Sequence, residues 1–157
     1  MKAKRIGTGA AMATGVLAAT ALAFAPSAAA VTPLTATINA NCGIFGGGAA
    51  TLTATQSGTS ATITVTSSIK APIALAKDSI ASTFTFVKAS GGTTVFSGTK
   101  NPAMATGAAV TVGPLSGTVA SGDSLQAYGG SLKMTIFGVL VTCTPTAAQS
   151  PGPFVFS

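Results

Sequence analysis

The sequence predicts an all-β protein built from antiparallel strands, and three features of the chain support this prediction. Beyond residue 30, apolar and polar residues alternate with a period of two, the pattern of strands that bury one face. Turns that contain glycine or proline separate the alternating stretches at short intervals. No repeat with a period of roughly 20 to 50 residues is present, which disfavours a solenoid or a propeller. We therefore expect an antiparallel sandwich or barrel.

The first 30 residues have the composition of a signal peptide. Basic residues at positions 2, 4 and 5 precede an alanine-rich apolar stretch, which Pro26 interrupts before an Ala-Ala-Ala cleavage site at 28–30. A membrane anchor is the alternative, but it requires about 20 consecutive apolar residues, and glycine and threonine dilute this segment. We expect a signal-peptide helix over 1–30, cleaved before Val31. The mature protein is then secreted, extracellular or in the cell envelope, with no later membrane span.

The first part of the domain predicts three strands. Alternation over 34–42 predicts a strand with Cys42 on its apolar face. Alternation over 50–55 and 61–66, around a Ser57-Gly58 turn, predicts a hairpin with one aliphatic face and one threonine face. The threonine face consists of Thr51, Thr53, Thr55, Thr62, Thr64 and Thr66.

The second part predicts another hairpin and several short strands. Residues 82–88 and 93–98 flank a Ser90-Gly91-Gly92 turn. This hairpin carries the three phenylalanines Phe84, Phe86 and Phe96. Gly-Pro and Gly-containing pairs then delimit short strands at 110–112, 115–120 and 124–128. Residues 73–81 are the one segment that suits a helical turn.

A long last strand is predicted over 132–143, and the parity of its inward side chains changes along its length. The apolar positions 132, 134 and 136 place even numbers toward the core, whereas an inward Cys143 requires odd numbers. Because strand periodicity is two, one extra residue must intervene, and a β-bulge at Phe137-Gly138 would supply it. The rival interpretation is a strand buried on both faces, which needs no bulge.

The domain is expected to span 31–145 and to be closed by one disulfide. Cys42 and Cys143 are the only cysteines and lie near its two ends. In an exported protein such a pair is typical of a disulfide, whereas two thiols without histidine or glutamate cannot complete a zinc site. A Pro/Ser-rich tail follows over 146–157, and its Phe154-Val155-Phe156 segment is a candidate edge strand.

The charged residues exclude several classes of function. Five lysines and two aspartates are the only charged residues after the signal peptide, and together they leave a net charge of +3 without a basic cluster. This excludes a nucleic-acid partner, which requires a basic stripe that neutralises phosphates. General acid–base chemistry needs titratable groups that meet, and the chain has no histidine and only Asp78 and Asp123 as carboxylates.

Two Ser-x-x-Lys tetrads, at 67–70 and 97–100, are the nearest approach to a catalytic motif. In penicillin-recognising enzymes this motif opens a helix and is joined by Ser-Asp-Asn and Lys-Thr-Gly elements. Here both tetrads end predicted strands, and the other two elements are absent from the sequence. We therefore expect no catalytic residues, no metal site and no cofactor, and hence no enzyme.

Three motifs resemble small secreted β-sandwich domains of unknown function from actinobacteria. These are a Cys-Gly-x-Phe-Gly entry at 42–46, a pair of Gly-x-Leu and Leu-x-Gly turns around Leu115, and a Val-x-Cys-x-Pro exit at 141–145. The resemblance implies export and an immunoglobulin-like sandwich, and it carries no catalytic residues. A weaker similarity is to the apoprotein carriers of enediyne antibiotics, which typically have two disulfides. The expected fold is therefore an antiparallel immunoglobulin-like β-sandwich.

Two kinds of function fit these expectations. The first is a non-enzymatic secreted or envelope protein that acts through its surface, with cell-wall polymer or a second copy of itself as partner. The threonine face is the candidate surface, although the β-propensity of threonine explains the same pattern. The second is a carrier that holds an apolar small molecule between the sheets, near Phe84, Phe86 and Phe96.

Overall fold

The computed structural model describes residues 30–157, so the signal peptide expected over 1–30 lies outside the described residues except for Ala30. The described chain is all-β, as the period-two alternation predicts. Its elements are β1 (Thr35–Asn41), the 3₁₀ turn η1 (Gly43–Phe45), β2 (Gly47–Ser57), β3 (Ser60–Lys70), β4 (Ala81–Lys88), β5 (Thr93–Thr99), β6 (Ala109–Thr118), β7 (Ser124–Ile136), β8 (Val139–Pro145) and β9 (Phe154–Val155).

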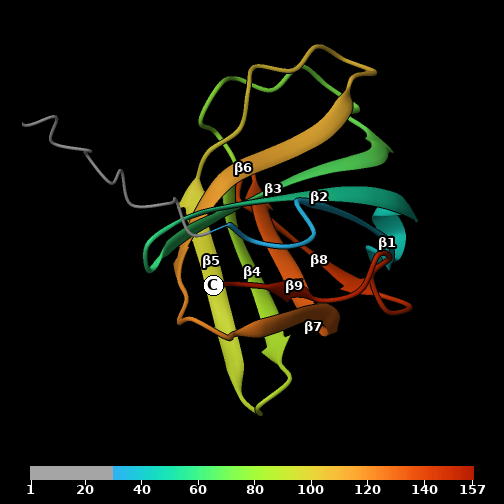
Figure 1. The fold of residues 1–157 in the computed structure, drawn as a ribbon. Coiled ribbons are helices and arrows are strands. Elements are labelled where there is room, and N and C mark those ends of the chain that lie inside the picture. Colours follow the sequence, from blue (N-terminus) through green and yellow to red (C-terminus); the bar gives the residue numbers. More distant parts are fainter. Residues whose placement is uncertain (1–29) are drawn as a thin grey trace, which may run out of the picture.

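The strands form a closed barrel, and the expectation of an immunoglobulin-like sandwich is wrong. The order β4-β5-β6-β3-β2-β1-β8-β7 returns to β4 through a β4–β7 ladder, which closes eight antiparallel strands into one cylinder (Figure 1). β9 is a ninth strand that pairs with the first residues of β7. Alternation is the same in both architectures, because each buries one face of every strand. The pairing of β4 with β7 is what distinguishes them.

Two glycine-containing segments bend strands that the sequence had divided. β6 continues through Gly113-Pro114, and β7 continues through Gly129-Gly130. The β4–β7 register shifts at this second segment, because Thr85 pairs with Ser131 whereas Val87 pairs with Gln126. A side chain at Gly130 would collide with the carbonyl oxygen of Thr85, so only glycine permits this approach. The predicted short strands are therefore parts of longer, bent ones.

The predicted β-bulge at Phe137-Gly138 is wrong, because the chain reverses there. β7 and β8 form a hairpin in which Ile136 pairs with Val139, and Phe137 and Gly138 have φ angles of 48° and 77°. Positive φ at both positions suits a two-residue hairpin turn. Directly paired residues share a face, so the even positions of β7 and the odd positions of β8 point the same way. The inward-facing positions do change from even to odd numbers between β7 and β8, and the hairpin turn causes this change.

Two long loops, 71–80 and 100–108, extend from the barrel. The first contains no helical turn, contrary to the expectation for 73–81. The side chain of buried Asn101 ties the loops together: its Oδ1 accepts from the backbone N–H groups of Ser79 and Ile80, and its Nδ2 donates to the carbonyl of Ala76. A backbone bridge between Leu75 and Met104 adds to this connection. The loops therefore form one ordered projection.

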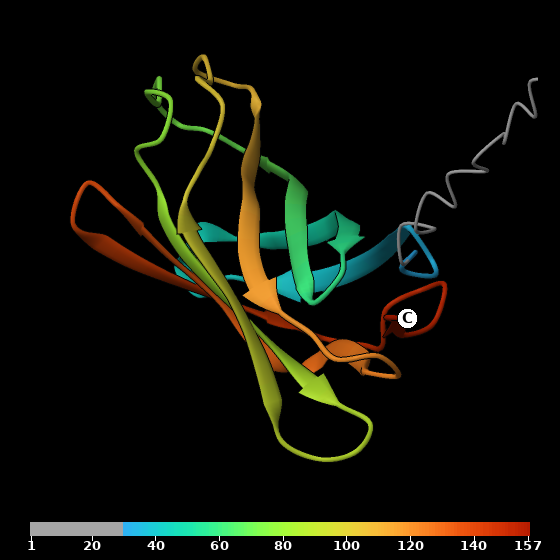
Figure 2. The same ribbon diagram turned by 60° about the vertical axis from the view of Figure 1, so that its left-hand side comes forward.

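The barrel has two distinct ends (Figure 2). The open end is bounded by η1, the loops 71–80 and 100–108, and the β7–β8 turn. The closed end is bounded by the β2–β3 and β4–β5 turns, the 119–123 turn and β9. The segment after residue 145 returns along the wall to the closed end, where the candidate edge strand forms β9 and both Phe154 and Phe156 are fully buried.

Candidate functional site

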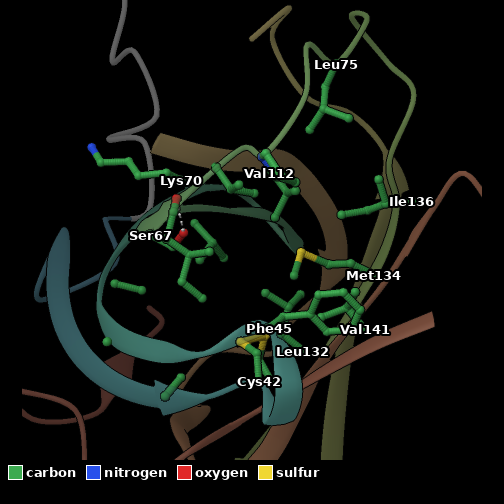
Figure 3. A pocket seen from close by; sticks show the side chains of 18 of the residues that line it. Cys42, Phe45, Ser67, Lys70, Leu75, Val112, Leu132, Met134, Ile136 and Val141 are labelled. Atoms are coloured by element: carbon green, nitrogen blue, oxygen red, sulfur yellow. Dashed lines mark hydrogen bonds between the residues drawn. A yellow bond between two sulfur atoms is a disulfide. The ribbon is translucent and has the colours of Figure 1, made fainter. Parts of the chain in front are cut away.

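A cavity of about 410 Å³ occupies the half of the barrel next to the open end (Figure 3). Seven of the eight barrel strands contribute to its wall, and most of the residues that they contribute are aliphatic. The wall includes Ile38 and Ala40, Ala50, Val65 and Ile69, Val110 and Val112, Leu132 and Met134, and Val141. An eight-stranded barrel is just wide enough for side chains to fill it or for one small ligand to be held. In the half next to the open end, the barrel is not filled and has room for one small ligand.

The cavity exists because two adjacent strands carry small inward residues near the open end. Ala40 in β1 and Gly48 and Ala50 in β2 line it, and Ala40 is paired directly with Gly48. Other parts of the wall carry larger residues such as Leu132 and Met134, and together the lining side chains leave the volume unfilled. Packing density in protein interiors is normally high, so an unfilled volume of this size is unusual.

A cluster of phenylalanines forms the floor of the cavity. Phe84, Phe86, Phe96 and Phe154, here called the phenylalanine plug, are each 0% exposed. The ring of Phe86 lies 4.2 Å from that of Phe84, 5.5 Å from that of Phe96 and 6.3 Å from that of Phe154, between ring centroids. Phe84 alone among them lines the cavity. Of the three phenylalanines expected beside a ligand, Phe84 borders the cavity, whereas Phe86 and Phe96 lie in the filled part of the barrel below it.

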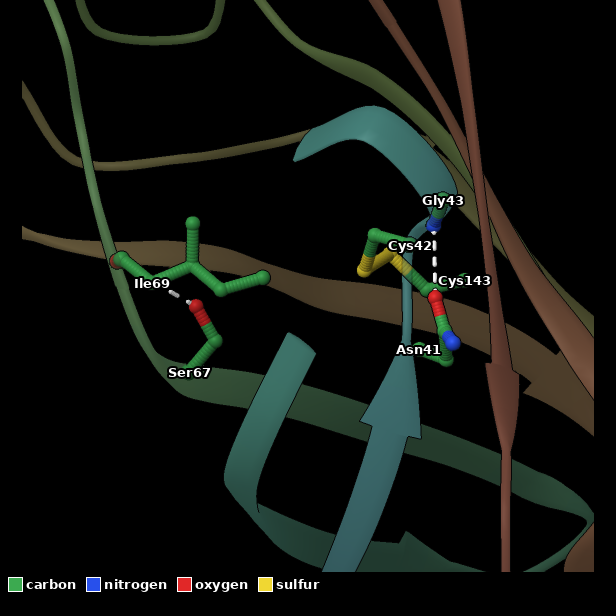
Figure 4. The surroundings of a disulfide bond; sticks show 6 residues. All are labelled: Asn41, Cys42, Gly43, Ser67, Ile69 and Cys143. Atoms are coloured by element: carbon green, nitrogen blue, oxygen red, sulfur yellow. Dashed lines mark hydrogen bonds between the residues drawn. A yellow bond between two sulfur atoms is a disulfide. The ribbon is translucent and has the colours of Figure 1, made fainter. Parts of the chain in front are cut away.

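The predicted disulfide is confirmed and forms part of the cavity wall. Cys42 and Cys143 are bonded, with Cα atoms 4.0 Å apart, and both line the cavity. The bond crosses the seam between β1 and β8, where the backbone ladder has only two residue pairs. The side chain of Asn41 accepts a hydrogen bond from the N–H of Gly43 at 2.8 Å and so fixes the start of η1 (Figure 4).

Polar groups are few and lie near the mouth. Ser67 lines the cavity, and its hydroxyl donates to the carbonyl of Ile69 at 3.5 Å. Lys70 is the one charged residue among the lining residues, and its side chain turns away from the cavity in Figure 3. An occupant would therefore be held by burial of apolar surface, with its polar groups at the mouth.

The two aspartates do not meet. Asp78 lies in the loop at the open end, 3.9 Å from both Lys77 and Lys100. Asp123 lies at the closed end, where it accepts from the N–H of Ala120 at 2.9 Å and pairs with Lys88 at 3.0 Å. These contacts, the Ala120 hydrogen bond foremost, lower the pKa of Asp123 although burial acts in the opposite direction. The arrangement provides no pair of carboxylates for acid–base work.

The threonine face is assembled across the β2–β3 hairpin on the outer wall of the barrel. Its members are direct cross-strand partners: Thr51 with Thr66, Thr53 with Thr64, and Thr55 with Thr62. The hydroxyl oxygens of Thr55 and Thr62 are 2.6 Å apart. The face lies outside the cavity, since the alternate residues of both strands point inward.

Sequence reasoning missed the cavity, although one signal for it was present. Ala40 and Ala50 are small residues on the apolar faces of two neighbouring predicted strands, and Gly48 lies in the glycine run between these strands. Within residues 30–157, no cluster of three or more potential metal ligands occurs, and no helix is long and apolar enough to cross a membrane. No family model, curated protein or solved structure matches the chain.

Proposed function

We propose that the protein is a non-enzymatic, exported carrier that binds one apolar small molecule in the hollow half of its barrel. The observation that supports this most directly is the apolar cavity of about 410 Å³, which opens at one end of the barrel. Pockets that bind small molecules typically have volumes of roughly 300 to 1,000 Å³ and mainly hydrophobic walls. The cavity meets both criteria.

The chemistry of the wall defines the class of ligand. An apolar cavity does not attract water, because water there would lose hydrogen bonds, so an apolar molecule can enter without displacing tightly bound solvent. Burial contributes about 25 cal/mol for each Å² of apolar surface removed from water. A charged group placed deep in the cavity would have no partner there, because Lys70 lies at the mouth. The ligand is therefore uncharged, or carries its polar group at one end.

Export is supported by two features. The disulfide between Cys42 and Cys143 is of the kind that persists in oxidising compartments. The basic, apolar and small-residue segments of 1–30 are arranged as in a signal peptide.

Fluorescence titration with N-phenyl-1-naphthylamine, a neutral apolar probe, tests the proposal. We expect saturable binding to one site per chain. Ala50→Phe places a ring in the cavity and should weaken binding at least tenfold. Ala49→Phe is the matched control, because Ala49 is the next residue of β2 and is exposed. Absence of saturable binding, or equal binding by the Ala50→Phe protein, would refute the carrier function.

A second candidate function, association through the threonine face, is supported by the extension of this face beyond the hairpin. Thr37, Thr51, Thr66 and Thr111 form one row across four strands by direct pairing. A regular row of hydroxyls on a face without charge suits a repetitive polymer or a second copy of the protein. Co-sedimentation with insoluble cell-wall polymer is the test, and Thr53→Lys combined with Thr64→Lys should abolish it.

A further inference from the structure

The open end of the barrel carries an unusual concentration of exposed apolar side chains. Of the ten large apolar residues exposed in the described chain, six belong to the segments that bound or flank the mouth. These six residues, here called the apolar rim, are Ile44, Phe45, Ile73, Phe137, Val139 and Leu140. Ile44 is 96% and Phe137 is 69% exposed, which is far from the burial expected of such residues. A concentration of exposed apolar side chains of this kind marks an interaction site.

The position of the apolar rim favours its insertion into a deformable surface. Phe137 occupies the tip of the β7–β8 hairpin, which projects from the barrel (Figure 2). The adjacent Val139 and the rim residues Phe45 and Ile73 also line the cavity. The rim is therefore continuous with the interior wall, which offers an apolar molecule an apolar path between them.

Charge differs between the two ends of the molecule. Lys70, Lys77 and Lys100 lie in or beside the segments of the open end, where Asp78 is the only acidic residue, which leaves +2. At the closed end Lys88 and Asp123 neutralise each other as an ion pair. The apolar rim is thus flanked by positive charge, a combination that suits the anionic surface of a lipid bilayer. A second copy that presented the same end would instead bring like charges together.

We propose that the open end docks on an anionic lipid membrane, with the apolar rim inserted at the interface, and that the cavity exchanges its ligand with the bilayer. The docking stands on the rim and the charges alone, whereas the exchange rests on the proposed carrier function. The ligand class is then narrowed to molecules that partition into membranes.

Flotation of the protein with lipid vesicles tests the docking. We expect the protein to float with vesicles that contain phosphatidylglycerol, and to do so less in high salt or with pure phosphatidylcholine. Phe137→Asp combined with Leu140→Ser should lower the bound fraction at least tenfold. Position 137 has φ of 48°, which aspartate tolerates, so the turn should be preserved. Leu34→Ser combined with Val95→Ser removes two exposed apolar residues outside the rim and should leave flotation unchanged.

A second pair of variants tests the charge without changing the rim. Lys70→Gln combined with Lys77→Gln should weaken flotation with anionic vesicles severalfold. Lys88→Gln, at the closed end of the barrel, is the control and should have little effect. Flotation that responds equally to both sets of variants would contradict docking through the open end.

The outcomes separate docking from ligand binding, because N-phenyl-1-naphthylamine binding is measured without vesicles. Probe binding without flotation would overturn the docking and leave the carrier function intact. Flotation without probe binding would overturn the carrier function and leave the docking intact. A dimer in sedimentation velocity that is lost in the Phe137→Asp, Leu140→Ser protein, together with absent flotation, would assign the rim to a second copy and refute the membrane.

Discussion

The same strands of this barrel build two halves with different sources of stability. On β7, Leu125 lies in the filled half, below the floor of the cavity, whereas Leu132 faces the cavity. The filled half is stabilised by side chains that meet across the interior, above all the phenylalanine plug. The hollow half lacks such contacts across its interior. It is held around its circumference by the disulfide and by the hydrogen bonds of Asn101.

This difference suggests how a small domain can keep an empty site. A cavity forfeits dispersion contacts between the residues that would otherwise meet there. The disulfide and the hydrogen bonds of Asn101, near the open end, offset that loss without occupying the interior. The predictions below test whether stability and ligand binding are divided between the halves in this way.

The largest effect is expected from removal of the disulfide. Cys42 and Cys143 are 101 residues apart, and a loop of that length corresponds to about 4–5 kcal/mol in the chain-entropy treatment. Urea unfolding of the Cys42→Ala, Cys143→Ala protein should show a loss of this size. Because the bond closes the hollow half, probe binding should also be lost, at urea concentrations below the unfolding midpoint. An unchanged midpoint would contradict the assigned role of the bond.

Two leucines of β7 compare the halves directly. Leu125→Ala should lower the free energy of unfolding by about 3–5 kcal/mol, since it opens a void in a filled core. Leu132→Ala enlarges a space that already exists, so fewer contacts are lost and about 1–2 kcal/mol is expected. Urea unfolding of both proteins measures the difference. Equal losses would show that the hollow half is as closely packed as the filled half.

Two alanines of β2 allow the same comparison of the halves by enlarging a side chain instead of truncating one. Ala54 is 1% exposed and does not line the cavity, so Ala54→Phe should overpack the core and cost about 3 kcal/mol. Ala50→Phe places its ring in the cavity, and its free energy of unfolding should stay within about 1 kcal/mol of the original protein. Thermal unfolding provides the comparison. A larger loss for Ala50→Phe than for Ala54→Phe would mean that Ala50 lies in the filled core and Ala54 beside the cavity, the reverse of what the structure indicates.

The smallest effect concerns pH and the closed end. The pKa of Asp123 is lowered from its ordinary value of 3.8, so its contribution to stability is present above about pH 4 and is lost as the pH falls through the folded-state pKa. Asp123→Asn should therefore cost on the order of 1 kcal/mol at pH 7 and progressively less as the pH falls below about 4 towards 2. Urea unfolding at both pH values measures this. Probe binding at pH 7 should be unaffected, because Asp123 is remote from the cavity.

The sequence alone determined the first five strands of the protein and its covalent bond. Alternation located the first five strands within a few residues, because one buried face imposes a period of two on each strand regardless of its neighbours. The two cysteines could pair only with each other. The parity change between Leu132 and Cys143 was also visible in the sequence, although its cause was assigned to a bulge instead of a turn.

The tertiary structure alone decided how the strands close and what they enclose. Whether β4 pairs with β7 depends on an alignment of segments roughly 40 to 50 residues apart, and local patterns contain no information on such pairings. Glycines at 113, 129 and 130 bend strands or end them according to the space that neighbouring strands leave. The cavity follows from closure, because Ala40, Gly48 and Ala50 leave a void only when the other residues that line the closed barrel do not fill it.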